Sequence, residues 1–485
     1  MLSFIQKFYN NYKSELESQI IFKDVIYDKK IIYKNITKYA EAFKNLGIKD
    51  NDRVSLVCGK DIKSIYAMFG LMSLSAIPVL VDKNLSKENL IATASEDFCI
   101  VDDNLDISEN KILKIDELDK IAQKYTGNVL AIKKEILSKV FNSDDTLFLT
   151  HTSGTTGKPK KVHYSEKNID WVCKEYSKIY QFDTNDSIAF ILPFHYCLGI
   201  IPCGLTALLY GKRILLTSDE TTEEITKSLV KYKISIITMF PYFYRQLVQL
   251  NLEKYDFSNL KICDCGGEIL PVAVIEKFTK RAKVLITEGY GQTETCSLTH
   301  FLVPDSQGKY RLGSVGKLCE DLEIMLLDND GNEVEKNTVG EAYIKGPAVM
   351  KGYDDPITTN ASINSEGWFK TGDLFYYDDE NFYYLIARKS DVGTISPSIV
   401  KGIRELEEKI YAIDGVREYT FISNTNGTIT LFVIPSISMP KKITELREKI
   451  ESIITGIEIK VDYIKFVNSL PRTSTGKVQK QIIKT

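Results

Sequence analysis

Short apolar runs alternate with helical patterns through the first hundred residues. Residues 54–58 and 78–81 are mainly apolar runs that predict buried strands, and residues 62–75 between them have helical spacing. Strands that alternate with helices are typical of a parallel sheet in an α/β protein. These positions form no reactive motif, so we expect residues 24–105 to pack in the core and to contribute no catalytic or binding residue.

The middle of the chain repeats one pattern, a strand that ends at a glycine or proline turn. Three apolar runs end in this way, at Pro193, at Pro241 and at the pair Gly266 and Gly267. The carboxyl ends of parallel strands share one edge of a sheet, where α/β proteins bind ligands. The three turns therefore predict one pocket.

Residues 187–211 contain no Asp, Glu, Lys or Arg over a length that spans a bilayer. The segment also contains Pro193, Pro202 and three glycines, which interrupt a continuous helix. We predict a buried strand, a loop and a core helix here, and no membrane span.

The last third of the chain predicts two smaller units. Residues 313–391 alternate glycine, aspartate and aromatic positions, as in a small β subdomain. The segments beyond them predict a helix at 403–413, a strand at 429–434, a helix at 443–454 and a strand at 457–467. We therefore predict an α/β fold: a large N-terminal domain (residues 1–388) of layered α/β sheets plus the β subdomain, then a small α+β C-terminal domain (residues 389–485).

Composition excludes several classes of protein. A length of 485 residues, 44% of them hydrophobic and 26% charged, predicts a globular protein of two or more domains. The net charge of −3 gives no basic footprint for nucleic acid. Nine cysteines without a CxxC spacing, and four histidines apart from them, predict reduced thiols in a cytoplasmic protein and no zinc site. Early charges in the first residues predict no signal peptide.

The strongest motif covers residues 149–162. It holds five hydroxyls, two glycines and three lysines between an apolar strand and a helical stretch that begins near Ser165. Glycines turn backbone amides inward, and hydroxyls and lysines bind phosphate oxygens, so the segment predicts a nucleotide triphosphate loop. A Walker loop needs four residues before its Gly-Lys pair, but only two separate Gly154 from Gly157. A flexible surface loop stays the alternative.

This loop resembles the signature of the AMP-forming acyl- and aryl-acid ligases. That adenylate-forming superfamily includes acyl-CoA synthetases, firefly luciferase and nonribosomal-peptide adenylation domains, and further matches run from about residue 20 to Lys477. The resemblance implies that ATP is bound by the loop residues Thr152, Ser153, Gly154, Thr155, Thr156, Gly157 and Lys158.

Residues 288–295 resemble a second family motif. There the tyrosine stacks on adenine, the threonine binds the α-phosphate and the glutamate holds Mg²⁺, which implies these roles for Tyr290, Thr293 and Glu294. Read without the resemblance, the segment is a tight polar turn. The remaining ATP-binding residues implied here are Gly267, Glu268, Gly289 and Gly291.

Five later residues take their roles from the resemblance. Asp373 corresponds to the carboxylate that binds the ribose hydroxyls, and Arg388 to an arginine that contacts the nucleotide at the domain junction. Ser390 and Asp391 form the hinge of a mobile C-terminal domain, and Lys477 is its catalytic lysine. Without the resemblance, Asp373 is an ordinary turn residue and Lys477 belongs to a basic tail.

The turn at residues 193–199 corresponds to the family segment beside the acyl tunnel, with His195 as a movable gate. Read alone, this histidine is a satisfied core residue. The turn lacks the aspartate that pairs with the ammonium of α-amino acids, so the substrate predicted is a simple carboxylic acid. The predicted acyl pocket is lined by His195, Phe240, Tyr242, Cys265, Gly266 and Cys296.

The implied reaction activates the acid to an acyl-adenylate with release of pyrophosphate. Lys477, Thr293, Glu294 and His195 are the implied catalytic residues, and the acceptor is the pantetheine thiol of CoA or of an acyl carrier protein. Residues 392–402 depart from the family pattern after the hinge, so the thiol step has less support than adenylation. An oxygenase that uses the adenylate, and a nucleotide-binding module without turnover, stay open.

Overall fold

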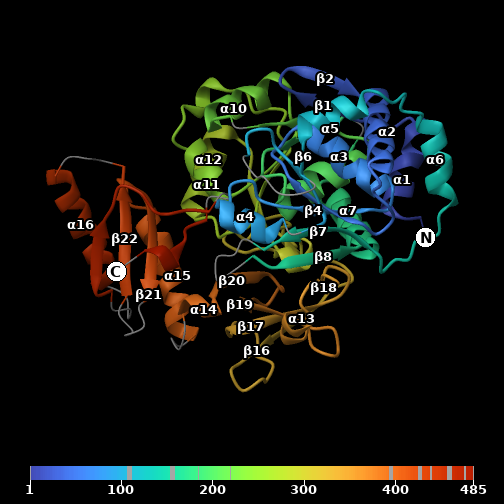
Figure 1. Cartoon of the computed structure of the whole chain (residues 1–485). Coiled ribbons are helices and arrows are strands. Elements are labelled where there is room, and N and C mark those ends of the chain that lie inside the picture. Colours follow the sequence, from blue (N-terminus) through green and yellow to red (C-terminus); the bar gives the residue numbers. More distant parts are fainter. Residues whose placement is uncertain are drawn as a thin grey trace.

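The computed structural model describes residues 2–94, 96–105, 112–152, 159–183, 185–218, 220–392, 397–423, 429–436, 440–455, 461–473 and 477–483. Figure 1 shows a large body that contains the N-terminus, a small sheet at its lower edge and a C-terminal unit at its side. Among the described residues the strands form four sheets. This architecture confirms the predicted fold class.

The largest sheet has parallel strands at its centre, in the order β15-β14-β13-β12-β11-β9-β10-β1-β2. The neighbours from β13 through to β1 run parallel, and the strands at both edges run antiparallel. The turns after β9, β11 and β12 therefore share one edge of the sheet, as predicted. The strands are β1 (Gln19–Phe22), β2 (Val25–Asp28), β9 (Ser187–Phe190), β10 (Arg213–Leu216), β11 (Ile236–Met239), β12 (Ile262–Cys265), β13 (Ile286–Tyr290), β14 (His300–Phe301) and β15 (Lys317–Leu318).

The second large sheet has the order β18-β8-β7-β4-β3-β5-β6. Its strands β3 and β4 and the helix between them confirm the elements predicted for residues 54–81. Strand β8 pairs antiparallel with β7 and was not predicted, because its polar residues resemble a loop. The strands are β3 (Arg53–Val57), β4 (Ile77–Leu80), β5 (Phe98–Val101), β6 (Ile112–Lys114), β7 (Thr146–His151), β8 (Lys161–Ser165) and β18 (Gly352–Tyr353).

Helices fill the space between these two sheets and cover their outer faces. Along β1, Ile20 and Phe22 face the core between the sheets, and Ile21 faces the outer core, as the alternation of side chains in a strand requires. The helices that contribute to the inner core are α1 (Phe4–Asn10), α2 (Lys29–Asn45), α3 (Ile62–Ser73), α5 (Ile115–Ala122), α6 (Val129–Ser138), α7 (Glu166–Ile179), α8 (Cys197–Gly199) and α9 (Ala207–Leu209). The outer faces are covered by α10 (Thr222–Lys231), α11 (Pro241–Leu247) and α12 (Val272–Ala282) on the larger sheet and by α4 (Lys87–Thr93) on the other.

The charge-free segment forms the predicted buried strand, loop and core helix. After β9 and its turn, the chain is helical from α8 to α9, and it widens to π geometry over Ile200–Thr206. Pro202 lies in this turn and has no amide hydrogen, which disfavours a regular α-helix. Within the described ranges, no helix is both long enough and apolar enough to cross a membrane.

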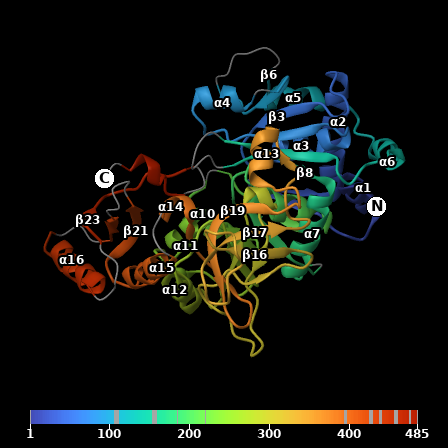
Figure 2. The same ribbon diagram turned by 90° about the horizontal axis from the view of Figure 1, so that it is seen from below.

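The small sheet and the C-terminal unit follow in sequence. The small sheet has the order β16-β17-β19-β20, and the C-terminal sheet has the order β21-β22-β23 with its own core. Figure 2 shows the C-terminal unit beside α10, α11 and α12. Strand β21 was not predicted, because its charged residues interrupt the apolar pattern. The elements are β16 (Glu323–Leu327), β17 (Gly340–Lys345), α13 (Pro356–Ser362), β19 (Phe369–Tyr377), β20 (Tyr383–Arg388), α14 (Lys389–Val392), α15 (Pro397–Tyr411), β21 (Val416–Ser423), β22 (Ile429–Pro435), α16 (Pro440–Thr455) and β23 (Tyr463–Phe466).

The buried carboxyl group of Glu166, at the start of α7, makes stability depend on pH. Its Oε2 atom accepts a hydrogen bond from Phe4 N at 2.7 Å, and burial raises the pKa of Glu166 from 4.5 to about 7. Because the folded state holds the proton more tightly, the carboxyl group destabilises the protein increasingly as pH rises from about 4.5 to 7. Glu166→Gln should therefore gain up to about 3 kcal/mol over the wild type between pH 5 and pH 8.

Urea titrations of both proteins at the two pH values measure this gain. Glu135→Gln, at a solvent-exposed position of α6, is the matched control and should show no pH-dependent difference. If the two proteins differed in unfolding free energy by the same amount at pH 5 and at pH 8, the raised pKa of Glu166 would be contradicted.

Candidate active site

The phosphate loop joins β7 to β8. Residues 153–158, which hold most of its predicted ATP contacts, lie outside the described residues, but both ends of the loop are placed. Thr152 N donates to Lys160 O at 3.0 Å, and Lys160 N donates to Thr152 Oγ1 at 3.1 Å. These two hydrogen bonds hold the ends together, so the loop starts and finishes at one point of the sheet edge.

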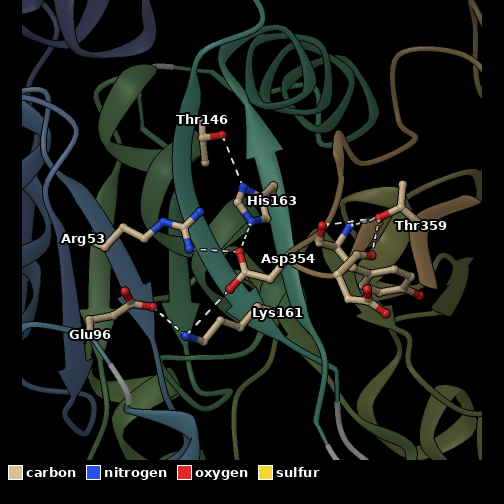
Figure 3. Close-up of polar contacts among 9 residues, drawn as sticks. Arg53, Glu96, Thr146, Lys161, His163, Asp354 and Thr359 are labelled. Carbon is tan, nitrogen blue, oxygen red and sulfur yellow. Dashed lines mark hydrogen bonds and ion pairs between the residues drawn. The ribbon is translucent and has the colours of Figure 1, made fainter. Parts of the chain in front are cut away.

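A charged cluster fixes β8 just after the loop. Asp354 Oδ1 accepts a hydrogen bond from Arg53 Nη1 at 2.9 Å and lies 2.6 Å from His163 Nε2 (Figure 3). Lys161 Nζ lies 2.5 Å from Glu96 Oε1 and 3.8 Å from Asp354 Oδ2. Since Asp354 follows β18 and Lys161 begins β8, the cluster holds together two segments that are far apart in sequence.

The pairing of β18 with β8 also positions Glu294. Tyr353, on β18, donates its hydroxyl hydrogen to Glu294 Oε1 at 2.7 Å. The ammonium group of Lys160 lies 5.0 Å from the centre of the Tyr353 ring. The Glu294 carboxylate therefore lies close to Lys160, at the described end of the predicted phosphate loop.

Asp373, on β19, is the centre of a hydrogen-bond network. Its Oδ2 atom accepts from the Tyr290 hydroxyl at 2.7 Å and from Gln292 Nε2 at 2.6 Å, and its Oδ1 atom accepts from Arg388 Nη1 at 2.9 Å. Gln292 and Arg388 also donate to Thr371 O. Asp373 is 6% exposed, so the network joins β13, β19 and β20 in a largely buried setting.

The segment after β13 is closely packed. Thr293 O accepts a hydrogen bond from the Tyr164 hydroxyl at 2.6 Å. A Cβ atom on Gly291 would lie 2.2 Å from the backbone carbon of Ser297, so only glycine fits there. Gly267 has a φ of +91°, which favours glycine at the turn after β12. These contacts fix the backbone between the two predicted motifs.

Lys477 extends from the C-terminal unit into this site. Its ammonium group lies close to the Tyr196 hydroxyl and to Glu268. Burial disfavours the charged form, but Tyr196 and Glu268 outweigh it and raise the pKa of Lys477 above its usual value. Thr473 N donates to Lys477 O at 2.9 Å, which ties the backbone of Lys477 to that of Thr473.

Contacts between the C-terminal unit and the large body support this position of Lys477. Val272 N donates to Glu408 Oε2 at 2.9 Å. The Arg472 guanidinium lies 5.1 Å from the centre of the Tyr242 ring. The structure thus brings Lys477 to the same edge of the sheet as the Asp373 network and Glu294.

A pocket opens beside this edge, with walls that include Tyr176, Leu198, Asp264, Gly266, Gly289 and Phe301. Of the predicted acyl-pocket residues, Gly266 lies in its wall, and the ring of Phe240 packs on that of Tyr196, a further wall residue, at 4.9 Å.

The other predicted pocket residues, His195, Tyr242, Cys265 and Cys296, do not line this pocket. His195 Nε2 lies 3.7 Å from Asp82 Oδ2, and Tyr242 contacts Arg472. Cys265 packs in the outer core and Cys296 in the inner core. All nine cysteines are free thiols, and eight of them are buried.

Four residues of the site were not predicted from the sequence. Gln292 and Tyr196 lie inside motifs that were identified, so their polar side chains were a signal. Asp264 is a charged residue in an otherwise apolar strand, which was a second signal. Tyr353 gave none, because its role depends on the pairing of β18 with β8.

Known proteins share this architecture over nearly the whole chain. The 2-succinylbenzoate–CoA ligase of Oceanobacillus iheyensis is 25% identical over 460 residues, which are 92% of this chain and 92% of that protein. The crystal structure of an anthranilate CoA ligase with anthranoyl-AMP has a TM-score of 0.86 at 20% identity, and the match covers 99% of this chain and 96% of that one. The o-succinylbenzoate CoA synthetase of Bacillus subtilis, solved with ATP and magnesium, has a TM-score of 0.81 at 22% identity over 99% of both chains.

The two structural matches show a common fold. The model of the AMP-binding enzyme family matches residues 30–354, more than half of the sequence. The chain therefore belongs to the AMP-binding enzyme family.

Proposed function

We propose that the protein activates a carboxylic acid with ATP and then transfers the acyl group to a thiol. The observation that carries the proposal is the convergence of Lys477, Glu294 and the Asp373 network at one sheet edge, next to a pocket and to the ends of the phosphate loop. The relatives named above are CoA ligases, which supports CoA as the acceptor over the pantetheine of an acyl carrier protein.

In the first step, a carboxylate oxygen of the acid forms a bond to the α-phosphorus of ATP. The bond between that phosphorus and the bridging oxygen breaks, and pyrophosphate leaves with the electron pair. Catalysis of such transfers is mainly positioning and charge stabilisation. We assign charge stabilisation to Lys477 and to Thr293, and positioning of the acid to the turn that holds His195.

Nucleotide binding is assigned to the residues around Asp373. A carboxylate has about four acceptor positions, and the network uses three hydrogen bonds, so Asp373 keeps capacity for a ribose hydroxyl. The hydrogen bond from Arg388 holds the Asp373 carboxylate in place. The hydrogen bond from the Tyr290 hydroxyl to Asp373 orients the Tyr290 ring beside this carboxylate.

The residues present also fit Mg²⁺. In the parts of the chain that the structure describes, no three His, Cys, Asp or Glu side chains group as a metal site, and Mg²⁺ characteristically binds one or two carboxylates plus phosphate oxygens. Glu294 would hold the ion, which when bound neutralises charge on the phosphates. Tyr353 orients the Glu294 carboxylate.

The C-terminal unit is proposed to move. We place the hinge at Ser390 and Asp391, directly after β20, with residues 1–388 on one side and 389–485 on the other. Turning about this point would withdraw Lys477 after adenylation and leave the intermediate accessible to the thiol.

A pyrophosphate-exchange screen tests the function. The full chain is incubated with ATP, Mg²⁺, labelled pyrophosphate and one acid at a time, drawn from fatty, branched and aryl acids, with a reaction without acid as the control. We expect acid-dependent label in ATP, and a thioester once CoA is added. Binding of ATP without exchange for any acid would instead identify a nucleotide-binding module, and oxygen uptake with ATP would identify an oxygenase.

A further inference from the structure

Asp264 is a buried carboxyl group in the wall of the pocket. Its neighbours Cys263 and Cys265 pack in the outer core, so the Asp264 side chain faces the inner helices. The residue is 2% exposed. Its Oδ2 atom accepts a hydrogen bond from the Tyr180 hydroxyl at 2.8 Å, but among the described residues no group hydrogen-bonds Oδ1. A buried carboxylate oxygen without a partner is unfavourable, so a bound group is its natural complement.

The free oxygen is directed at the glycine-lined part of the pocket. A Cβ atom added to Gly289 would lie 3.6 Å from Asp264 Oδ1, and both residues line the pocket. Gly266 is on the same face of β12, two residues nearer the sheet edge, so Asp264 lies about 7 Å deeper than Gly266. Both glycines are closely packed: a Cβ atom on Gly266 would lie 3.0 Å from Leu198 Cδ2, and one on Gly289 would lie 3.2 Å from Phe301 Cδ2, so a larger residue at either position would narrow the pocket beside Asp264.

The opposite end of the pocket meets the catalytic groups. Tyr196 and Gln292 line this end, and they contact Lys477 and Asp373 respectively. An acid whose carboxylate lies at this end therefore extends its other end toward Asp264.

A purely architectural role for Asp264 explains the Tyr180 hydrogen bond but not the second oxygen. The Tyr180 hydroxyl also lies 2.8 Å from Thr238 Oγ1, so a neutral partner for it already exists on the neighbouring strand. A carboxyl group adds a second acceptor atom, Oδ1, to which no side chain or backbone group in the described part of the chain is hydrogen-bonded.

We propose that Asp264 selects the acid, because Oδ1 accepts a hydrogen bond from a hydroxyl or amino group at the end of the substrate remote from its carboxylate. The inference rests on the proposed function and specifies its substrate class. Between the two polar ends, Leu198 and Phe301 provide apolar walls, which fit a ring or a short alkyl segment. Such a substrate differs from an α-amino acid, whose ammonium group lies beside its carboxylate.

The protonation of Asp264 agrees with an accepting role. Burial raises the pKa of Asp264 to about 7, and the hydroxyls of Tyr180 and Thr238 and the backbone amide of Cys265 act against this rise. At pH 8 the ionised form predominates, and a donor on Oδ1 would favour it further.

Isosteric pairs of acids test the proposal in pyrophosphate exchange at pH 8. The pairs are 4-aminobenzoate against 4-methylbenzoate, and 5-aminopentanoate against hexanoate. A further acid, 4-methoxybenzoate, can accept a hydrogen bond at its remote end but cannot donate one. We expect the wild type to prefer the amino member of at least one pair by about 10- to 100-fold in kcat/KM, because the methyl member leaves the carboxylate unpaired. Asp264→Leu should reverse this preference, and Glu166→Gln, which changes a buried carboxyl group far from the pocket, should keep it.

The wild-type comparison decides the matter even if Asp264→Leu does not fold, which its melting temperature and ATP binding reveal. Equal use of both members of each pair, or preference for the methoxy acid, would overturn the role of Asp264 and leave the ligase function intact. Exchange with none of the acids here or in the wider screen would instead remove the proposed function itself.

Discussion

Replacing Lys477 with alanine is expected to reduce pyrophosphate exchange by about 10²- to 10³-fold, the usual loss when one stabilising donor is removed from a reacting oxygen. The ammonium group of Lys477 is held between Tyr196 and Glu268 and stays protonated because its pKa is raised. Its charge is thus available where oxygens become more negative. Transfer to CoA from supplied acyl-adenylate should change only a few-fold, since that step does not use the lysine.

Two further variants sharpen this prediction. Lys477→Arg keeps the positive charge but replaces the compact ammonium group with a planar guanidinium group. It should recover only part of the exchange rate. Lys465→Ala removes an exposed lysine from β23 in the same C-terminal unit and should leave both steps unchanged. A loss of exchange and transfer in equal measure for Lys477→Ala would show that the lysine holds the fold or binds a substrate common to both steps.

The second large effect is expected at Asp373. Asp373→Ala removes the acceptor of three hydrogen bonds and leaves Tyr290, Gln292 and Arg388 without it. We expect the KM for ATP to rise by about 10²-fold, with a smaller change in kcat, because the contact to ribose is the same in the ground state and the transition state. Exchange rates measured against ATP concentration, at a saturating concentration of the acid, give both constants.

Glu323→Gln is the matched control for this variant. It lies in the same small sheet, on β16, and its side chain is 64% exposed. Its ATP dependence should equal that of the wild type. An unchanged KM for Asp373→Ala, in a protein whose melting temperature is also unchanged, would contradict the nucleotide assignment.

Local sequence patterns predicted the helices and strands whose apolar residues are buried. They missed the strands whose burial depends on contacts with residues distant in sequence. The strands at residues 54–58 and 78–81 and the buried helix after Pro193 were predicted because their residues are mainly apolar. Strands β8 and β21 were missed because charged or polar residues interrupt their apolar patterns, and the burial of these strands depends on tertiary contacts. For β8 that contact is Asp354, about 190 residues away in sequence.

The same division holds for the site. Motifs predicted Lys477, Glu294 and Asp373 through a family resemblance, and the structure brings all three to one edge of the sheet. The contact partners of these residues were harder to predict. Tyr353 beside Glu294 and Tyr196 beside Lys477 depend on tertiary packing that the sequence motifs do not specify. Asp264 was visible as one charge in a buried strand, but its unpaired oxygen is a property of the packed structure.

The junction after Arg388 separates two groups of site residues along the polypeptide. Every group bonded to Asp373 precedes the junction, whereas Lys477 follows it. With the roles proposed above, substitutions around Asp373 would change the affinity for ATP, and substitutions at Lys477 would change the rate of adenylation. An ancestor with such an arrangement could change its affinity for the nucleotide and its rate of turnover by separate evolutionary steps.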